Sequence, residues 1–597
     1  MSKKILALIK NRYFLAVLAV IILGTFLRSY HFAGWLHFEL DQARDAKVID
    51  LAINEGIGNL PLLGPKAAGT FLRLGPIFYY FNYLSALVFG DTPAGIAVIT
   101  LLFGILALPV FYLFLRRYFD KNLSLGLLLI FSVSLFFVLY SRFSWNPNSL
   151  ALFAVLTLYC LLRAVDREEK RKGMWLVSFF VSLTIASQLH FLALMALPTI
   201  AFLFLIIKRP RIKAKFWIIS VLLALFLYTP VFINEWKTGG ENVKQFFKAT
   251  EKKSTTDNPH SILGKIVRSY SENSLGYFIA LSGQDEASFP KLIQTGTSLS
   301  GIKCDKSCEE KLPWGIASFL FFTAGLALSI RKFIKEKDEK KKDFALLISL
   351  WCIVTIVLFV PIAFSIAPRF FLLVSALPFI FLGFIIEFIG EKSSKKTFLI
   401  LTIIICGLLA IANLAKIKER FEQMSKAASE SFKTPTDRIL KERHRVTLEQ
   451  QYDIADYIKS EFASNNYPVY LTSDPFYERA LTYHIEKAKI PIDTFNNALK
   501  SKKVYTKGNY FLVYPTESNF EADLVKYGQF YNLAERKSFG TLTLFKFSPK
   551  KEFVNADIQI FELSKEPQHA AGVPTRYRWE EIFQESAADE STTNEGL

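Results

Sequence analysis

The chain is poor in the residues that many catalytic motifs use. Its 597 residues include only five cysteines and seven histidines. No zinc-protease motif, phosphate-binding glycine loop or GxSxG nucleophile elbow is present. These absences leave zinc proteolysis, P-loop nucleotide hydrolysis and serine hydrolysis without support.

The few cysteines fall into two groups. Cys160, Cys352 and Cys406 lie in apolar segments, where packing is the simplest explanation. Cys304 and Cys308 lie in a polar loop, within GIKCDKSCEE. In an oxidising compartment this pair would form a small disulfide, whereas a CxxxC pair is also a weak signal of a metal site. The spacing leaves both alternatives open.

Hydrophobic residues, by contrast, are abundant. They make up 51% of the chain, which has 57 phenylalanines, 24 tyrosines and a mean hydropathy of +0.28. These values are typical of a polytopic membrane protein and not of a soluble enzyme or a disordered chain. A net charge of +18 would suggest nucleic acid in a soluble protein, but here Lys and Arg concentrate in short loops between apolar runs. We therefore expect no nucleic-acid partner.

Apolar runs of about 20 residues predict transmembrane helices. The first run follows a basic start and has a signal-like form without a convincing cleavage site, so we expect an uncleaved first helix. A shorter aromatic stretch, Gly75–Gly90, would either span the membrane or lie in its interface as an amphipathic helix. Hydropathy predicts about eleven spans, which begin near Tyr13, Pro93, Leu123, Ser149, Met174, Phe191, Phe216, Pro313, Phe344, Phe370 and Thr397.

The distribution of charge decides how Gly75–Gly90 is placed. If this stretch lies flat on the outside and the N-terminus is cytoplasmic, five basic loops face the cytoplasm: RRYFDK, RAVDREEKRK, KRPRIKAK, RKFIKEKDEKKK and EKSSKK. If it spans, all five move outside, so the positive-inside rule favours the flat arrangement. This topology of a multi-pass cell-membrane protein leaves outside a first outer loop, 29–92, a large outer loop, 234–312, and everything after about Asn413.

The composition changes after Asn413. Residues 1–413 form the predicted transmembrane module. A charged helical stretch then leads to the strand-like runs PVYLTSD, GNYFLVYP and GTLTLFKFSP, which predict a small extracytoplasmic α/β domain over residues 414–575. The last residues, 576–597, include QESAADESTTNEGL and predict disorder. The expected fold class is thus mainly α, with a C-terminal α/β domain.

An acidic cluster follows the first apolar run directly, in HFELDQARDAKVIDLAINEG. One interpretation is architectural: Asp41 would cap a helix that ends at Gly56, with Asp45 in its first turn. Capping does not explain Glu39 or Arg44, however. Because Asp41 and Asp45 are four residues apart, they share one helix face. A carboxylate pair at a membrane surface is suited to removing the proton of a hydroxyl group.

Four basic side chains map to the outer face, where the positive-inside rule does not require them: Lys66, Arg73, Arg142 and Arg369. Each one alone would be explained by snorkelling or by an ion pair. Together on one face they suggest an anion, and the natural anion at a membrane is the phosphate of a lipid. His190, in ASQLHFLAL, is either an interfacial histidine or a substrate contact.

These residues lie in segments that resemble those of a known family. LDQARDA (Leu40–Ala46) resembles the acidic first-loop motif of the family 39 integral-membrane glycosyltransferases, the group of the protein O-mannosyltransferases and aminoarabinose transferases, which have the GT-C fold. LGPIFYYFNYLSALVFG resembles their aromatic juxtamembrane helix, and LYSRFSWNPNSLALF the segment that ends their third span. APRFFLLVSALP resembles the start of a late span. The resemblance covers residues 1–413.

The resemblance implies a reaction and a donor. A sugar would move from a polyprenyl phosphate to an acceptor hydroxyl or lipid group on a protein, glycan or lipid, outside the cytoplasmic membrane. Asp41 matches the leading aspartate of the family's motif and would be the base of an inverting attack. Gln42 stands where many members have Glu, and Asn148 where many have an acidic residue. The departure at Gln42 puts a divalent metal in doubt, and Asp41 and His190 are its possible ligands.

The expected substrate-binding residues are those of the acidic cluster and the outer face: Glu39, Gln42, Arg44, Asp45, Lys66, Arg73, Arg142, Asn148, His190 and Arg369. Other functions stay open at this point, namely an oligosaccharide ligase of similar fold, a lipid or polysaccharide transporter or flippase, and a receptor with an outer binding domain. The Trp-Trp-Asp signature expected of an N-oligosaccharyltransferase is absent. A transporter would favour charges midway along its spans, whereas here they gather at one face.

Overall fold

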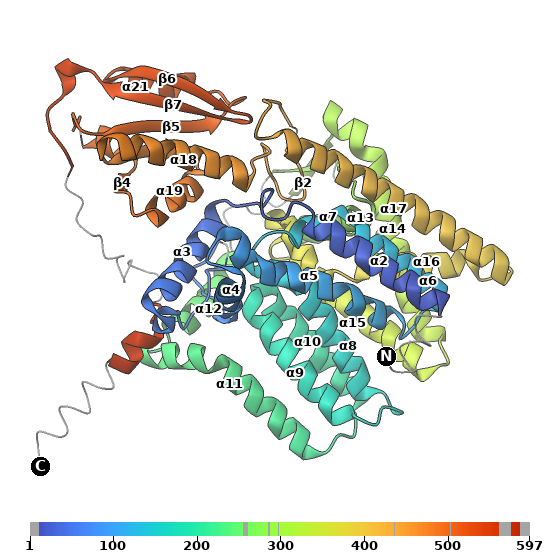
Figure 1. Cartoon of the computed structure of the whole chain (residues 1–597). Helices are drawn as coiled ribbons and strands as arrows, with labels where there is room; N and C mark the ends of the chain where they lie inside the picture. Colours follow the sequence, from blue (N-terminus) through green and yellow to red (C-terminus); the bar gives the residue numbers. More distant parts are fainter. Residues whose placement is uncertain are drawn as a thin grey trace, which may run out of the picture.

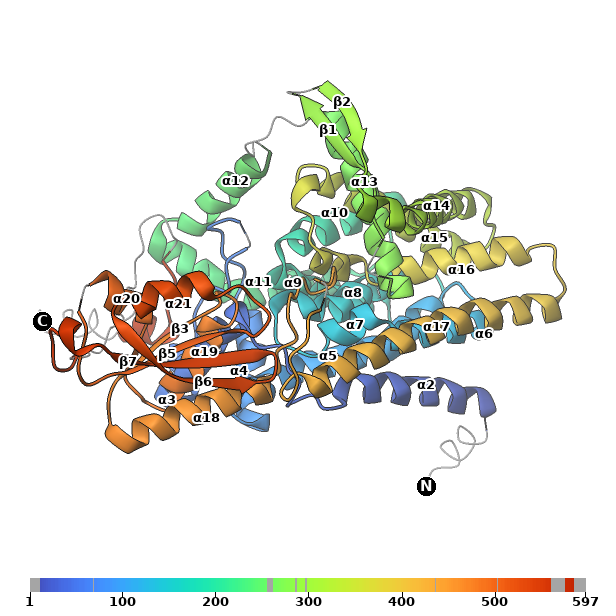
Figure 2. The ribbon, with the colours of Figure 1, turned by 90° about the horizontal axis from the view of Figure 1, so that it is seen from above.

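The structure is a computed structural model, which describes residues 11–67, 69–254, 261–284, 287–295, 298–434, 436–501, 503–559 and 575–584. Figure 1 shows a bundle of long helices with a smaller sheet domain at one end. The fold is mainly α with a C-terminal α/β domain, as the sequence predicts. The start of α2 (Arg12–Ser29) lies at the opposite end of the bundle from the sheet (Figure 2).

Nine helices in the described part of the chain are long and apolar enough to cross a membrane. η4 (Pro368–Val374) and α16 (Leu377–Gly390), which meet at 61°, together make a tenth candidate. These ten agree with ten of the eleven predicted spans. The nine are α2, α5 (Pro93–Leu115), α8 (Leu150–Val165) with η2 (Asn146–Ser149) before it, α9 (Lys172–Leu189), α10 (Phe191–Lys208), α11 (Ala214–Thr238), α14 (Lys306–Lys335), α15 (Glu339–Phe359) and α17 (Lys395–Lys426).

The eleventh predicted span is not one long helix. α6 (Lys121–Val133) is about 20 Å long at 1.5 Å per residue, short of the ~30 Å hydrocarbon core. The helix breaks at Ser134, and α7 (Leu135–Tyr140) follows. A distant side chain satisfies the interrupted backbone, because Asn413 Oδ1 accepts the N–H of Leu135 at 3.0 Å. Hydropathy detects the apolar run but not this partner.

The aromatic stretch that ends at Gly90 forms α4 (Ile77–Phe89), whose 13 residues are too few to cross the hydrocarbon core. α4 lies near α3 (Leu40–Glu55), at the end of the bundle that carries the sheet domain (Figure 1). Its exposed side chains are apolar and include Leu84, Leu87 and Val88. This length and this pattern agree with the predicted interfacial helix.

The basic loops between the spans lie together at one face of the bundle. Ion pairs join them across the sequence, since Arg117 lies 2.6 Å from Asp166 and Lys332 lies 2.8 Å from Glu387. In Figure 2 the turn between α16 and α17, which is one of these loops, lies at the end far from the sheet domain. The charge segregation predicted from the sequence is therefore a property of the folded bundle.

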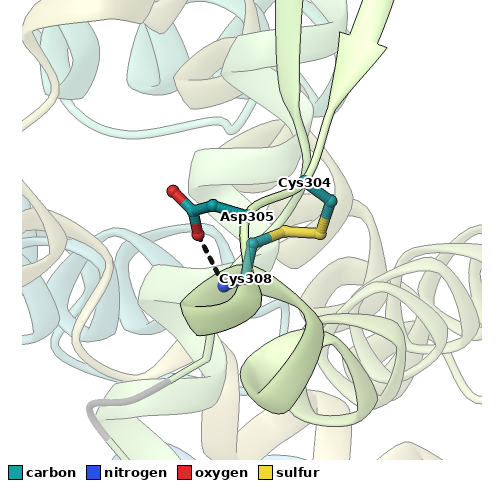
Figure 3. Close-up of a disulfide and its surroundings, with 3 residues drawn as sticks. All are labelled: Cys304, Asp305 and Cys308. Carbon is teal, nitrogen blue, oxygen red and sulfur yellow. Dashed lines mark hydrogen bonds between the residues drawn. A yellow bond between two sulfur atoms is a disulfide. The ribbon is translucent and has the colours of Figure 1, made fainter.

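The large outer loop 234–312 is largely folded. Cys304 and Cys308 are joined by a disulfide at the start of α14, with Cα atoms 5.3 Å apart (Figure 3). The N–H of Cys308 donates to the side chain of Asp305 at 2.9 Å, which caps α14. Of the two alternatives for this cysteine pair, the structure contains the disulfide. The loop also holds α12 (Glu241–Ser254), α13 (Ile262–Ser282) and the antiparallel hairpin of β1 (Lys291–Thr295) and β2 (Ser298–Lys303).

The α/β domain follows α17, which runs past Asn413, so the predicted domain boundary falls within a helix. Its sheet has the strand order β4-β3-β5-β7-β6, with β3 parallel to β4 and β5, and β7 antiparallel to β5 and β6. The three predicted runs form β3, β5 and β7. The polar, exposed β6 and the two-residue β4 were not predicted. The strands are β3 (Val469–Ser473), β4 (Ile492–Asp493), β5 (Asn509–Pro515), β6 (Tyr531–Phe539) and β7 (Leu542–Pro549), and the helices are α18 (Leu448–Asn465), α19 (Glu478–Lys487), α20 (Phe495–Lys500) and α21 (Glu521–Gly528).

The C-terminal segment differs from the sequence prediction. Disorder is expected over 576–597, but residues 575–584 have a defined structure. Arg578 forms a β-bridge with Pro61 in the first outer loop, and residues 579–584 are helical. The stretch TRYRWEEIF contains the aromatic and basic residues that make this docking possible, and only the more polar sequence after it matches the composition of a disordered tail. Residues 585–597 lie outside the described residues.

Polar contacts fasten the α/β domain to the first outer loop. Lys487 of α19 bridges Asp50 of α3 and Asp91, at 2.8 and 2.9 Å. His37 Nδ1 lies 2.7 Å from a carboxylate oxygen of Glu442, which leads into the domain. The loop before α3 is thereby held between the helix bundle and the sheet domain.

We expect His37 to make this attachment depend on pH. Burial disfavours the charged ring, but the Glu39 and Glu442 carboxylates outweigh it and raise the pKa of His37 to about 9. A histidine whose pKa is raised on folding contributes its full stabilisation of the folded chain at pH values below its unfolded pKa, near 6.5. This stabilisation is lost as the pH rises through the folded pKa, about 9. His37→Gln should therefore cost on the order of 2 kcal/mol near neutral pH and little near pH 10.

Thermal unfolding of the purified wild-type and His37→Gln chains, measured from pH 6 to pH 10, tests this expectation. The difference between their melting temperatures should shrink steadily toward the alkaline end. A difference that stays constant over the whole range would contradict it.

Candidate active site

α3 begins with a capping box formed by Glu39 and Gln42. The backbone N–H of Glu39 donates to Gln42 Oε1 at 3.2 Å, and the Glu39 side chain accepts an N–H of the first turn. The helix ends before Gly56, whose φ of 110° suits glycine. The end of the helix is as predicted, but its cap is Glu39 and not Asp41. Capping accounts for Glu39 and Gln42 but not for Asp41.

Arg44 binds two carboxylates at once. Its guanidinium donates to Asp41 Oδ1 at 2.7 Å and to both oxygens of Asp45, at 2.9 and 3.0 Å. The hydroxyl of Tyr79, on α4, donates to Asp45 Oδ1 at 3.0 Å. The Asp45 side chain is 2% exposed and that of Asp41 is 37% exposed. Asp45 is therefore a buried anchor for Arg44, while Asp41 stands at the surface of the site.

Lys66 and Arg73 lie opposite each other on a short hairpin of the first outer loop. They form an antiparallel bridge, and beside it the N–H of Leu74 donates to the carbonyl of Pro65 at 3.0 Å. Asn242 of α12 holds the Arg73 backbone with both ends of its amide, accepting at 2.8 Å and donating at 3.1 Å. Backbone contacts thus fix the two cations in place.

The cations of this region disfavour one another's charge. Burial, together with the positive charges of Arg576 and Arg44, lowers the pKa of Arg73 to about 10. Burial and the same arginines, with Arg73 itself, lower the pKa of Lys66. Within the described part of the chain, Arg73 Nε is buried without a hydrogen-bond partner. A cluster of this kind is suited to binding an anion.

A second group of predicted residues lies around Trp145. The guanidinium carbon of Arg369 lies 5.0 Å from the centroid of the Trp145 ring. His190 Nδ1 caps α10, and its ring packs against Phe370, with centroids 5.5 Å apart. The Asp41 carboxylate acts electrostatically on the Arg369 guanidinium, which connects this second group with the first.

Two predicted substrate-binding residues are turned inward. Arg142 is buried and donates to the carbonyls of Leu27 and Arg28, at 3.2 and 2.9 Å, where α2 ends. Asn148 is also buried, and its amide donates to the carbonyl of Phe143 at 2.9 Å. These contacts give both side chains a structural role, and their role in binding a substrate stays a prediction.

A divalent metal does not fit the donors near the site. The Arg44 guanidinium, which bonds Asp41, would repel a metal ion at that carboxylate, and Nδ1 of His190, the other predicted ligand, already accepts an N–H of α10. Among the described residues one group has the spacing of a metal site, formed by His37, Glu39 and Glu442. Two cations already bond the Glu442 carboxylate, and they would repel a metal ion: Arg420 and Arg445. We derive no step through a metal.

Sequence reasoning missed two side chains of this region. Tyr79 lies in the aromatic segment that carries the family resemblance, but nothing in the sequence pairs its hydroxyl with Asp45, which lies 34 residues earlier in the chain. Arg576 belongs to the tail, 576–597, for which the sequence predicts disorder. Its position next to aromatic residues, in TRYRW, is the one signal in the sequence that this part of the tail docks onto the protein.

Comparisons with known proteins agree with the fold and with part of the sequence. Residues 74–234 match the model of the dolichyl-phosphate-mannose-protein mannosyltransferase family. The structure is similar to that of ArnT from Cupriavidus metallidurans bound to undecaprenyl phosphate, with a TM-score of 0.52 and 11% identity over 91% of this chain and 99% of ArnT. For ArnT in the apo state the TM-score is 0.51, at 11% identity over 91% of this chain and 98% of ArnT.

A weaker similarity connects the chain with an archaeal enzyme. The oligosaccharyltransferase AglB from Archaeoglobus fulgidus, in complex with an inhibitory peptide and a dolichol-phosphate, gives a TM-score of 0.48 and 12% identity over 92% of this chain and 75% of AglB. None of the curated proteins matches the chain in sequence. The chain is a multi-pass membrane protein with the GT-C fold, and its match to the mannosyltransferase family indicates a glycosyltransferase similar to those of family 39.

Proposed function

We propose that the protein transfers a sugar from a polyprenyl phosphate to a hydroxyl or lipid group of a protein, glycan or lipid acceptor at the outer face of the cytoplasmic membrane. One observation carries the proposal. Arg44, which bonds the partly exposed carboxylate of Asp41, is within electrostatic range of two cations that have no carboxylate partner among the described residues, Lys66 and Arg73. ArnT, which shares this fold, binds undecaprenyl phosphate, and the matching family uses a dolichyl-phosphate-linked mannose.

In this proposal Asp41 is the catalytic base. Arg44 fixes its Oδ1, and no other donor hydrogen-bonds the carboxylate within the described residues, so Oδ2 is left to accept a proton. The acceptor oxygen bonds to the anomeric carbon while its proton passes to Asp41. The bond between the anomeric carbon and the phosphate oxygen breaks, and its electron pair stays on the phosphate. Because the acceptor attacks from the opposite side, the configuration inverts.

Lys66 and Arg73 would bind the phosphate as it leaves. The departing phosphate gains negative charge, and fixed cations stabilise that charge more in the transition state than in the bound donor. A single preorganised donor of this kind is worth roughly 3 kcal/mol of the barrier. Arg44 is less suited to this role, because two carboxylates already engage it.

The position of the site suits a substrate with a lipid tail. α3 and α4 lie at the end of the helix bundle, next to the sheet domain (Figure 1). The apolar outer face of α4 provides a surface for a polyprenyl chain beside the phosphate-binding residues. A transporter would favour ionisable residues midway along its spans, and those of this site lie at the end instead.

Asp41→Asn tests the catalytic step. Since the amide cannot accept the proton, we expect product formation to fall by about 10²–10⁴-fold while the affinity for undecaprenyl phosphate stays close to that of the wild type. Product is measured by mass analysis of cell-envelope glycans in a deletion strain that carries each variant, and affinity on the purified chain. Glu55→Gln, an exposed change at the end of the same helix, is the matched control and should retain both. Wild-type glycan levels with Asp41→Asn would rule out this base.

Cysteine labelling tests the proposed orientation, in which the N-terminus is cytoplasmic and the α/β domain outside. Lys66, Lys170 and Ser501 are exposed and mark the first outer loop, a basic loop and the α/β domain. With an impermeant thiol reagent on intact cells, we expect Lys66→Cys and Ser501→Cys to be labelled and Lys170→Cys to be labelled only after lysis. The reverse pattern would place the site in the cytoplasm and contradict the proposal.

A further inference from the structure

The segment 575–584, which we call the C-terminal strap, is fastened to the outer surface by its backbone. Asn234, near the end of α11, holds it with both ends of its amide: Nδ2 donates to the carbonyl of Thr575 at 3.1 Å, and Oδ1 accepts the N–H of Tyr577 at 3.0 Å. The N–H of Leu62, in the first outer loop, donates to the Tyr577 carbonyl at 2.8 Å. The strap thus runs between the first outer loop and α11.

Two side chains after Tyr577 add to this attachment. Trp579 Nε1 donates to the hydroxyl of Tyr80, on α4, at 2.9 Å. Arg578 Nη1 donates to the side chain of Asn59, in η1 (Ile57–Asn59), at 3.1 Å. Hydrogen bonds therefore hold the strap at Thr575 and Tyr577, on either side of Arg576, and again at Arg578 and Trp579. They fix the position of Arg576.

Arg576 reaches the candidate active site. Its guanidinium carbon lies 5.7 Å from the centroid of the Tyr79 ring, and Nη1 donates to the Tyr79 hydroxyl at 3.5 Å. The same hydroxyl donates to Asp45, which anchors Arg44. The charge of Arg576 also acts on Arg73 across this space.

We propose that the strap is part of the donor site and that Arg576 binds the phosphate of the lipid-linked donor together with Lys66 and Arg73. This inference rests on the proposed function. Carboxylates engage Arg44, whereas the contacts of Arg576 within the described residues are with the neutral Tyr79. A guanidinium presents a planar fork of donors that matches a phosphate group.

The arrangement has a consequence for how the protein is built. The base and two phosphate-binding cations come from the first outer loop, and the third cation comes from the other end of the chain, after the α/β domain. The donor site is complete only when the strap is docked against the first outer loop. Loss of the strap should therefore weaken donor binding even though the base and the spans are intact.

Binding of undecaprenyl phosphate to the purified full-length chain tests the inference. Arg576→Gln should weaken binding by about 10-fold, equivalent to about 1.4 kcal/mol, since it removes a charge-assisted contact with the phosphate. Arg576→Lys, which keeps the charge, should recover most of the affinity. Arg479→Gln, which removes the same charge from an exposed position on α19, is the matched control and should bind as the wild type does. The uncharged undecaprenol should bind equally to all four chains, because it lacks the phosphate.

Arg73→Gln separates the two levels of the proposal. If Arg576→Gln binds undecaprenyl phosphate normally and Arg73→Gln does not, the strap has no part in the site and the proposed function stands. If neither change affects binding, the phosphate site of the proposed function fails as well.

Truncation gives a second test if Arg576→Gln is unstable. A chain that ends at Gln584 should bind undecaprenyl phosphate normally, and a chain that ends before Thr575 should bind it as weakly as Arg576→Gln. Equal binding by the two truncated chains would overturn the inference.

Discussion

The site depends on the way Arg44 is held between Asp41 and Asp45. Asp45 is buried, and a buried carboxylate is tolerated only when it is paired and hydrogen-bonded. Arg44 and Tyr79 supply that pairing. Removing one partner of such a buried pair typically costs 3–5 kcal/mol, so Arg44 is committed to its place. This commitment orients Asp41 and, in the proposed function, leaves the phosphate of the donor to other cations.

The first outer loop provides the proposed base and two of the three proposed phosphate-binding cations within a short stretch of chain. α3 carries Asp41, the following hairpin carries Lys66 and Arg73, and α4 closes the group with Tyr79. The loop is rigid because neighbours from distant parts of the sequence hold it. α19 contacts the back of α3 through Lys487, the strap crosses the loop, and α12 holds the hairpin. A loop that is fixed at all sides can keep a carboxylate and several cations at set positions beside a lipid surface.

The sequence predicts the features that depend on local composition. Runs of apolar residues located ten of the spans, the glycine at position 56 located the end of α3, and short strand-like runs located three strands of the sheet. It fails where a partner far away in the chain decides the outcome. Asn413 bonds the backbone where the helix breaks after α6, and Arg142 bonds the carbonyls at the end of α2. A capping box with Gln42 makes Glu39 the cap in place of Asp41.

Arg576 is the clearest case of a residue that sequence reasoning could not place. Polar composition predicts disorder for the tail, and whether such a tail folds depends on the surface that it meets.

The proposed phosphate site is tested most directly by a cryo-electron microscopy structure of the purified protein in a lipid nanodisc with undecaprenyl phosphate. The account predicts the phosphate within about 3–4 Å of Lys66 and Arg73, on the face that also carries Asp41 and the α/β domain. A phosphate bound among the basic loops at the opposite face, beside residues such as Arg117 and Lys332, would contradict it.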